Sequence, residues 1–205
     1  MTPSARRTLV TGASRPQGLE AVKQCLERGD RVIAASRNPA RVPVLADWRA
    51  KYGTLELLAL DPADAVSVAE AIPMLESITS SLDLLIIGPG EPGTHEQNGD
   101  KREHELGALS TIDLVEHYRR HAVAPMLLVR TLLPWLTAGE QPRVLFLHDA
   151  GAGASSRQTR ASYSVTASAA ALQSIVPILA EELSMEGVDV ASAPSVTSAT
   201  SADAS

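Results

Sequence analysis

Short apolar runs alternate along this chain with longer segments whose apolar residues recur at helical spacing. Runs of this kind predict strands at Arg7–Thr11, Arg31–Ser36, Thr54–Leu60, Leu82–Ile87, Arg143–Leu147 and Val188–Ala193. The fourth and fifth runs are almost continuously apolar, which is typical of strands that are buried on both faces. The pattern therefore predicts a parallel sheet that is covered by helices on its two sides.

Helical periodicity fills most of the intervals between these runs. It predicts helices over Gly18–Arg28, Pro43–Lys51, Ala63–Ser77, Ile112–Leu136 and Tyr163–Met185. Alternating strands and helices favour right-handed crossovers, so we expect an α/β protein with a Rossmann-like, doubly wound parallel sheet of about six strands. We assign residues 1–191 to a single domain. Residues 192–205 are rich in Ser and Ala and poor in apolar surface, and we predict a mobile tail there.

Composition narrows the class of protein. The 205 residues are 44% hydrophobic and carry a net charge of −6, which argues against a nucleic-acid partner because phosphate binding needs a basic surface. The single cysteine, Cys25, excludes an internal disulfide and fits a reducing compartment. No apolar run approaches the roughly 20 residues that a membrane span needs. We therefore expect a cytoplasmic protein that has neither a nucleic-acid nor a membrane partner.

A glycine-rich turn follows the first predicted strand and leads into the first helix. Such a turn directs backbone N–H groups and the helix dipole at an anion, usually the phosphates of a dinucleotide. Its sequence, TGASRPQGLE, contains the residues that fit the TGxxxGxG turn of the short-chain dehydrogenase/reductase family, namely Thr11, Gly12, Ser14, Arg15 and Gly18.

Other family marks follow in the expected order. Arg37 ends the second strand, Asp61 ends the third, Gly90 follows the fourth and Tyr163 opens the last long helix. From residue 7 to about residue 198 the chain resembles a divergent member of this family, in its carbonyl-reductase and C-factor-like branch. The resemblance therefore covers a whole nucleotide-binding fold and not only the glycine-rich turn.

The resemblance implies which dinucleotide the chain would hold. Arg15 and Arg37 match residues that receive the adenosine 2′-phosphate, and Asp61 matches the residue that orients adenine. A guanidinium suits phosphate because it offers several donors in a fixed arrangement, so NADP is implied rather than NAD. The alternative is that either arginine is an ordinary solvated surface charge.

Several positions depart from the family pattern on the cofactor side. Pro16 and Gln17 replace the middle glycine of the turn and the small residue after it, and a proline there lacks one phosphate-facing N–H. The family's NNAG after the fourth strand is IGPG here, ending at Gly90. Pro194 and Ser195 stand where a Pro-Gly pair would approach the nicotinamide. We therefore predict weak or absent NADP binding.

The catalytic positions depart further. In this family a Tyr donates the proton, a Lys four residues later lowers the tyrosine pKa and binds ribose, and a Ser and an Asn complete the set. Tyr163 is retained, but Ala167 replaces the Lys, His148 the Ser and His121 the Asn. His117 and His121 share a helix face, yet HYRRH lacks the Glu of metalloprotease helices, and we expect no metal.

Three functions remain open on these residues. The first is a degenerate family member that has lost hydride transfer and acts as a partner subunit or binding module. The second is a cofactor-independent acid/base enzyme, such as a cyclase, isomerase or lyase, that uses His148, Tyr163 and His121. The third is an atypical NADPH-dependent carbonyl reductase.

Assembly is expected through the two longest helices. In the family these helices pair across a twofold axis, and Ile112–Leu136 and Tyr163–Met185 are strongly apolar here. No apolar residue larger than alanine follows Val196, so we expect the family's last strand and its substrate-covering segment to be missing. We predict a homodimer, or a heteromer with an intact relative.

Overall fold

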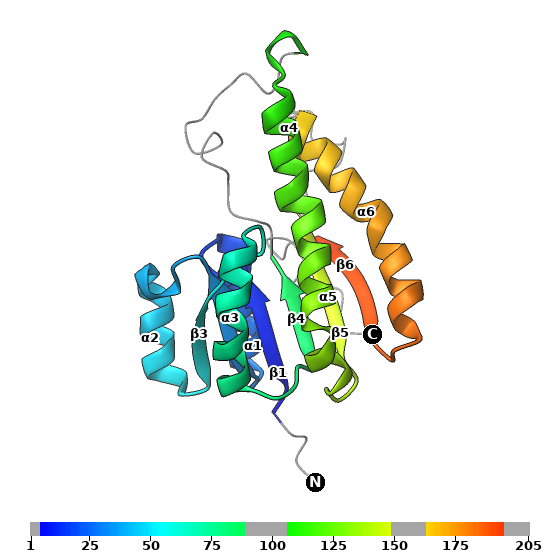
Figure 1. The fold of residues 1–205 in the computed structure, drawn as a ribbon. Coiled ribbons are helices and arrows are strands. Elements are labelled where there is room, and N and C mark those ends of the chain that lie inside the picture. The colour runs from blue at the N-terminus through cyan, green and yellow to red at the C-terminus, as the bar shows by residue number, and fades with distance from the viewer. Residues whose placement is uncertain (1–4, 89–105, 149–162, 195–205) are drawn as a thin grey trace.

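The computed structural model describes residues 5–88, 106–148 and 163–194. Its sheet is made of β1 (Arg7–Thr11), β2 (Arg31–Ser36), β3 (Leu55–Ala59), β4 (Leu84–Ile87), β5 (Arg143–His148) and β6 (Asp189–Pro194). All neighbouring strands are parallel, in the order β3-β2-β1-β4-β5-β6. This confirms the predicted α/β, Rossmann-like doubly wound sheet (Figure 1). Gly90 and residues 195–205 lie outside the described residues.

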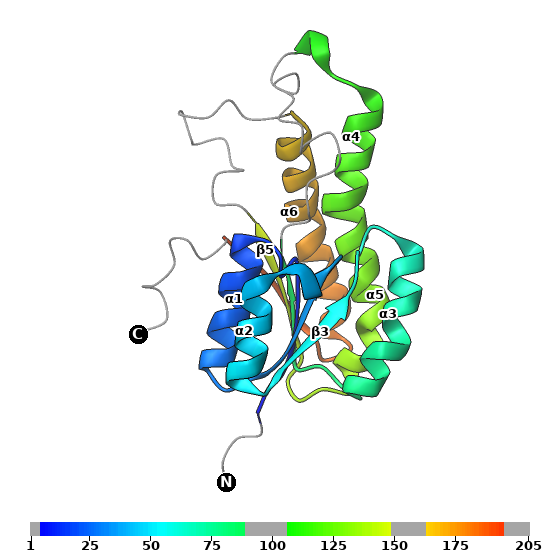
Figure 2. The same cartoon turned by 90° about the vertical axis from the view of Figure 1, so that its left-hand side faces the viewer.

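Helices cover both faces of the sheet (Figure 2). They are α1 (Pro16–Glu27), α2 (Pro43–Tyr52), α3 (Ala65–Ile78), α4 (Thr111–Tyr118), α5 (Ala124–Thr137) and α6 (Tyr163–Ser184). Helices α1 and α2 pack on one face, whereas α3, α5 and α6 pack on the other. In the described part of the chain, 3₁₀ turns lie in the connections at Pro39–Arg41 and Leu106–Ala108.

The core has two layers because successive side chains of a strand point to opposite faces of the sheet. In β1, Leu9 packs into the layer under α3, α5 and α6, and the next residue, Val10, packs into the layer under α1 and α2. All four residues of β4 are buried, as the continuous apolar run predicted. The only phenylalanine of the chain, Phe146, is fully buried in the first layer.

Local chemistry sets where the helices begin and end. Pro16 occupies the first turn of α1, two residues before the predicted start, and its fixed φ suits that position. The Asp64 side chain caps α3 by accepting the Val66 N–H at 2.9 Å. Gly53 ends α2 with φ of +62°, a left-handed conformation that favours glycine.

The predicted helix Ile112–Leu136 is present but interrupted. Between α4 and α5 the chain forms a π-helical segment, η5 (Arg119–Val123), and α4, η5 and α5 together form one continuous helix (Figure 1). A π turn adds one residue to the helical repeat, so an apolar pattern read at 3.6 residues per turn does not reveal it. Such insertions recur at functional sites. This one carries Arg120 and His121.

Helix α6 also has the length and apolar composition of a membrane-spanning helix, and it is the one helix among the described segments that does. Its residues Val176 and Leu183 nevertheless pack into the core beneath the sheet. Only 17% of this apolar window is buried, so the expectation that no apolar run approaches the length of a membrane span was wrong for α6 by length and composition. The absence of a membrane partner therefore stays a prediction.

Candidate functional site

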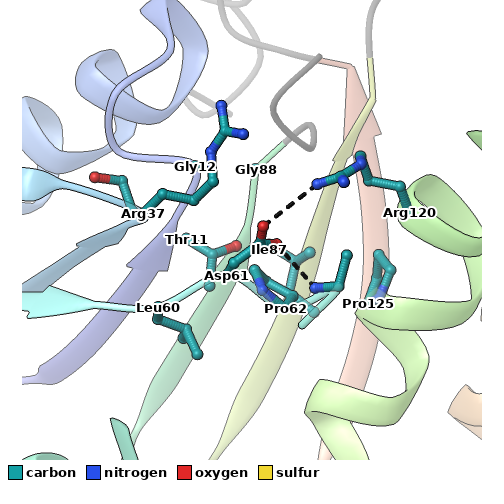
Figure 3. Close-up of a pocket in the computed structure, with 12 residues that line it drawn as sticks. Thr11, Gly12, Arg37, Leu60, Asp61, Pro62, Ile87, Gly88, Arg120 and Pro125 are labelled. Carbon is teal, nitrogen blue, oxygen red and sulfur yellow. Dashed lines mark hydrogen bonds and ion pairs between the residues drawn. The ribbon is translucent and has the colours of Figure 1, made fainter. Parts of the chain in front are cut away.

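A pocket lies at the carboxyl ends of β1, β2, β3 and β4 (Figure 3). It encloses about 440 Å³ of empty space, including its open mouth, and is lined by Thr11, Gly12, Ser36, Arg37, Leu60, Asp61, Pro62, Ala63, Ile87, Gly88, Arg120 and Pro125. Strand order reverses between β1 and β4, and ligands of doubly wound sheets bind at such a point. The pocket contains four of the predicted residues, Thr11, Gly12, Arg37 and Asp61.

The glycine-rich turn builds one wall of this pocket. Gly12 has φ of +67°, and its carbonyl oxygen accepts the Arg15 N–H at 2.9 Å. A Cβ on Gly18 would lie 2.1 Å from that same oxygen, so only glycine lets α1 approach the turn this closely. Ser14 and Arg15 are half-buried beside the turn, and Pro16 is exposed at the start of α1.

Gly88 has an equivalent role on the neighbouring strand, and sequence reasoning missed it. A Cβ at this position would lie 2.5 Å from the Thr11 carbonyl oxygen, so the chain after β4 passes against the end of β1. The signal was present in the IGPG motif, where the prediction fell on Gly90 instead. Gly88, the first glycine of that motif, lines the pocket.

Asp61 lies at the centre of the pocket with its carboxylate already held. Oδ1 accepts the Ala63 N–H at 2.9 Å, and Oδ2 pairs with Nη1 of Arg120 at 3.4 Å. Its backbone N–H donates to Ser67 Oγ at 2.9 Å. The side chains of Asp61 and Arg120 are only 19% and 16% exposed, which limits the screening of this pair by water.

Arg120 is the second site residue that the sequence did not single out. It projects from η5, and its Nη2 also pairs with Oε1 of Glu116 at 3.0 Å. Arg119 donates to the same carboxylate at 2.8 and 2.9 Å and to the Ala63 carbonyl oxygen. Hydrogen bonds from Arg119 and Arg120 lower the pKa of Glu116 to about 2, so its charge persists at neutral pH.

The opposite side of the pocket carries Ser36 and Arg37, at and just beyond the end of β2. Ser36 is 2% exposed, and its buried hydroxyl has no hydrogen-bond partner among the residues that the structure describes. Arg37 is exposed and approaches from the side opposite to Arg120, with Asp61 between them (Figure 3). Among the described residues, two cations and one carboxylate therefore surround this space.

A second polar cluster joins α4, η5 and α6. His117 is buried, and its Nδ1 lies 3.0 Å from Ser168 Oγ. Ser168 Oγ is also 3.1 Å from the Val165 carbonyl oxygen, one turn earlier in α6. The rings of His117 and His121 stack with centroids 4.1 Å apart and an interplanar angle of 24°. The cluster therefore places two imidazoles and a hydroxyl inside the helix pair.

Comparison with known proteins identifies the family. The short chain dehydrogenase profile matches residues 6–205. The chain belongs to the short chain dehydrogenase family. Over 105 residues it is 34% identical to (-)-isopiperitenone reductase of Mentha piperita, covering 49% of this chain and 33% of that protein. Over 149 residues it is 25% identical to an uncharacterized oxidoreductase of Schizosaccharomyces pombe, covering 71% of this chain and 55% of the other. The chain thus spans about a third to just over half of the length of these relatives.

Solved structures of this short chain dehydrogenase fold include carbonyl reductases. The NADPH-bound carbonyl reductase from chicken fatty liver superposes with a TM-score of 0.78 at 23% identity, over 92% of this chain and 78% of that one. The NADP complex of a carbonyl reductase from Pseudomonas aeruginosa PAO1 superposes with a TM-score of 0.70 at 26% identity, over 86% and 76% of the two chains. The resemblance to carbonyl reductases is thereby confirmed, and these relatives bind NADP(H).

The three predicted catalytic residues of this short chain dehydrogenase come from separate elements. His148 is the half-buried last residue of β5, His121 lies in η5, and Tyr163 is the first residue of α6 and is 45% exposed. None of the three lines the pocket described above. Figure 1 shows α6 beginning beside α4. A common acid/base site made of these three side chains stays a prediction.

Proposed function

We propose that this short chain dehydrogenase binds NADP(H) weakly at most and does not carry out ordinary hydride transfer, acting instead as a partner subunit or binding module. One observation carries the proposal. Tyr163 begins α6, Ala167 follows one turn later with its side chain exposed, and the 22-residue helix contains neither Lys nor Arg. No cation of this helix is therefore available to activate the phenol or hold a ribose.

The pocket retains features that suit a nucleotide. The close backbone approach at Gly12 and Gly18, the unsatisfied hydroxyl of Ser36 and the cation of Arg37 fit the phosphate and ribose of an adenosine moiety. When bound, NADPH would supply a hydride. The chain's own residues would hold the adenosine phosphates and leave the nicotinamide end without the family lysine.

Two features of the same pocket oppose tight binding. Pro16 offers no N–H at the start of α1, where a phosphate would approach the helix. The Asp61 carboxylate is already engaged by Arg120 and by a backbone N–H, so adenine must compete with an existing ion pair. We therefore expect a dissociation constant for NADPH above the low micromolar range.

Calorimetric titration of NADPH, followed by a turnover assay with a panel of small ketones and aldehydes, tests this proposal. We expect weak binding and no carbonyl-dependent NADPH oxidation. Ala167→Lys is the matched variant, because it returns an ammonium to an exposed position one turn after Tyr163. NADPH consumption by the natural chain that Tyr163→Phe abolishes would overturn the proposal and establish an atypical carbonyl reductase.

A cofactor-independent acid/base enzyme is the second candidate, favoured by the stacked imidazoles. His121 is held against His117, which Ser168 in turn holds, so the ring of His121 is oriented from within the protein. Imidazole exchanges protons near neutral pH without help from a lysine. Nucleotide-independent isomerase, lyase or cyclase turnover that His121→Asn abolishes would replace the first proposal.

We also propose a cytoplasmic dimer, either of two such chains or with an intact relative. Exposed apolar side chains support it: Ile112 and Val115 of α4 are 78% and 60% exposed, and Ile178 of α6 is 65% exposed. Apolar surface of this kind is often covered by a partner. Leu179, in contrast, packs against the core, so Ile178 is the better residue with which to probe the interface.

A further inference from the structure

The end of the pocket around Asp61 has an unusual chemistry. A carboxylate by itself only accepts hydrogen bonds, and a pocket that ends on one favours a ligand that donates. Here the guanidinium of Arg120 lies against the carboxylate, with Nη1 3.4 Å from Oδ2, and both residues line the pocket. The local charge of the carboxylate is thus neutralised, and N–H groups stand beside it.

Arg120 is held firmly in this position. Its Nη2 pairs with Glu116 at 3.0 Å, so two carboxylates on separate elements fix the two ends of the guanidinium. The side chain is 16% exposed, and displacing it would leave Asp61 without its charged partner. A ligand that needs the free carboxylate must therefore disrupt an ordered network.

Polar atoms around the pocket also lack partners. Ser36 Oγ and Arg120 Nε are buried and make no hydrogen bond to any residue that the structure describes. Buried polar groups are rarely left unsatisfied in native proteins. The Arg120 N–H requires an acceptor, whereas the Ser36 hydroxyl can either donate or accept.

Fold topology indicates which part of a nucleotide would reach Asp61. In a doubly wound sheet the pyrophosphate lies at the start of the first helix and the ribose at the end of the second strand. Asp61 follows β3, one strand farther along the edge of the sheet. The base of a bound nucleotide would therefore reach Asp61 and Arg120.

We propose that Arg120 is a specificity-determining residue of this pocket, which selects a nucleotide whose base presents a carbonyl oxygen to the guanidinium of Arg120 rather than the amino group of adenine. The inference rests on the proposed nucleotide-binding function. Adenine turns an amino donor toward a guanidinium that also donates. Hypoxanthine places a carbonyl oxygen at the same ring position, and Arg120 can donate to it.

Titration with NADPH and with its hypoxanthine analogue tests the proposal, because the two bases differ only in the group on C6, amino or oxo, and in the proton that the oxo form carries on N1. By calorimetry we expect the natural chain to bind the hypoxanthine analogue about three- to tenfold more tightly, the effect of one satisfied against one unsatisfied hydrogen bond. Arg120→Met removes the donor and exposes the carboxylate of Asp61. The variant should therefore bind NADPH more tightly and reverse the preference.

Two further variants make the result interpretable. Arg130→Met removes an exposed cation from α5, outside the pocket, and should leave the preference unchanged. Arg120→Gln keeps a polar side chain and serves if circular dichroism shows that the Arg120→Met variant is misfolded. Its ratio of affinities should still shift toward NADPH. Equal affinities, or a preference for NADPH in the natural chain, would overturn the inference alone. If neither the natural chain nor any variant bound either probe at millimolar concentration, the proposal that this pocket binds a nucleotide would be refuted as well.

Discussion

Replacement of Asp83 by Asn should destabilise the sheet at the amino ends of its strands, opposite the pocket. Asp83 is 6% exposed and lies just before β4. Its Oδ2 accepts the backbone N–H of Arg7 at 2.8 Å and Nε–H at 2.8 Å, and its Oδ1 accepts Nη2–H at 2.7 Å and the Glu140 N–H at 2.7 Å. One carboxylate therefore joins the start of β1 to the segments that lead into β4 and β5.

The magnitude follows from this environment. Removing one partner of a buried ion pair typically lowers the free energy of unfolding by 3–5 kcal/mol. Because the Arg7 side chain keeps 28% of its surface in water, we expect the lower end, about 3 kcal/mol for Asp83→Asn. For a chain of this size that corresponds to a fall in Tm of roughly 6–12 °C.

Urea unfolding followed by circular dichroism measures this change. Glu56→Gln is the control, since its pair with Arg49 joins side chains that are 48% and 54% exposed and should contribute less than about 1 kcal/mol. The reasoning would be refuted if, at neutral pH, Asp83→Asn lowered the free energy of unfolding no more than Glu56→Gln does.

The same variant predicts a pH dependence. Burial alone would raise the pKa of Asp83, but the hydrogen bonds from Arg7 and from the Glu140 N–H lower it below the ordinary value of 3.8. A carboxyl whose pKa is lowered by folding stabilises the protein above its unfolded pKa, and loses that contribution as pH falls through the folded value. The difference in free energy of unfolding between the natural chain and Asp83→Asn should therefore become smaller below about pH 4.

Three further outcomes are expected. Gly18→Ala should lower the Tm by several degrees and abolish nucleotide binding, because a Cβ there would lie 2.1 Å from the Gly12 carbonyl oxygen. Gly107→Ala is the control, since a Cβ at that position meets nothing within 4 Å, and it should change neither the Tm nor binding. Equal effects of the two substitutions would contradict the argument that α1 approaches the turn too closely for a side chain. Ile178→Asp should turn a dimer into a monomer in light scattering, and a natural chain that is monomeric at tens of micromolar would remove the dimer. Burial raises the pKa of the Cys25 thiol to about 11, so it should react with a thiol reagent at neutral pH only after urea is added, and fast labelling of the folded chain would show that α1 opens.

Much of the fold followed from the order of residues alone. Strand positions and helix types depend on local periodicity, and the nearly continuous apolar runs of β4 and β5 already required a sheet covered on both faces. The turn from Thr11 to Gly18 is equally local, because its geometry needs glycine at fixed spacing. Family resemblance then placed Arg37 and Asp61 at the ends of neighbouring strands, and the structure brings both into one pocket.

Tertiary structure alone decided which side chains complete these sites. Arg120 meets Asp61 across 59 positions of sequence, and His117 meets Ser168 across 51. Neither contact has a local signature, since each depends on how far η5 and α4 lie from β3 and α6 after packing. The π turn that carries Arg120 changes the phase of its helix by one residue, and no periodicity in the sequence marks it. Elements can be predicted from neighbours along the chain, whereas a pocket also depends on residues that only the packed fold brings together.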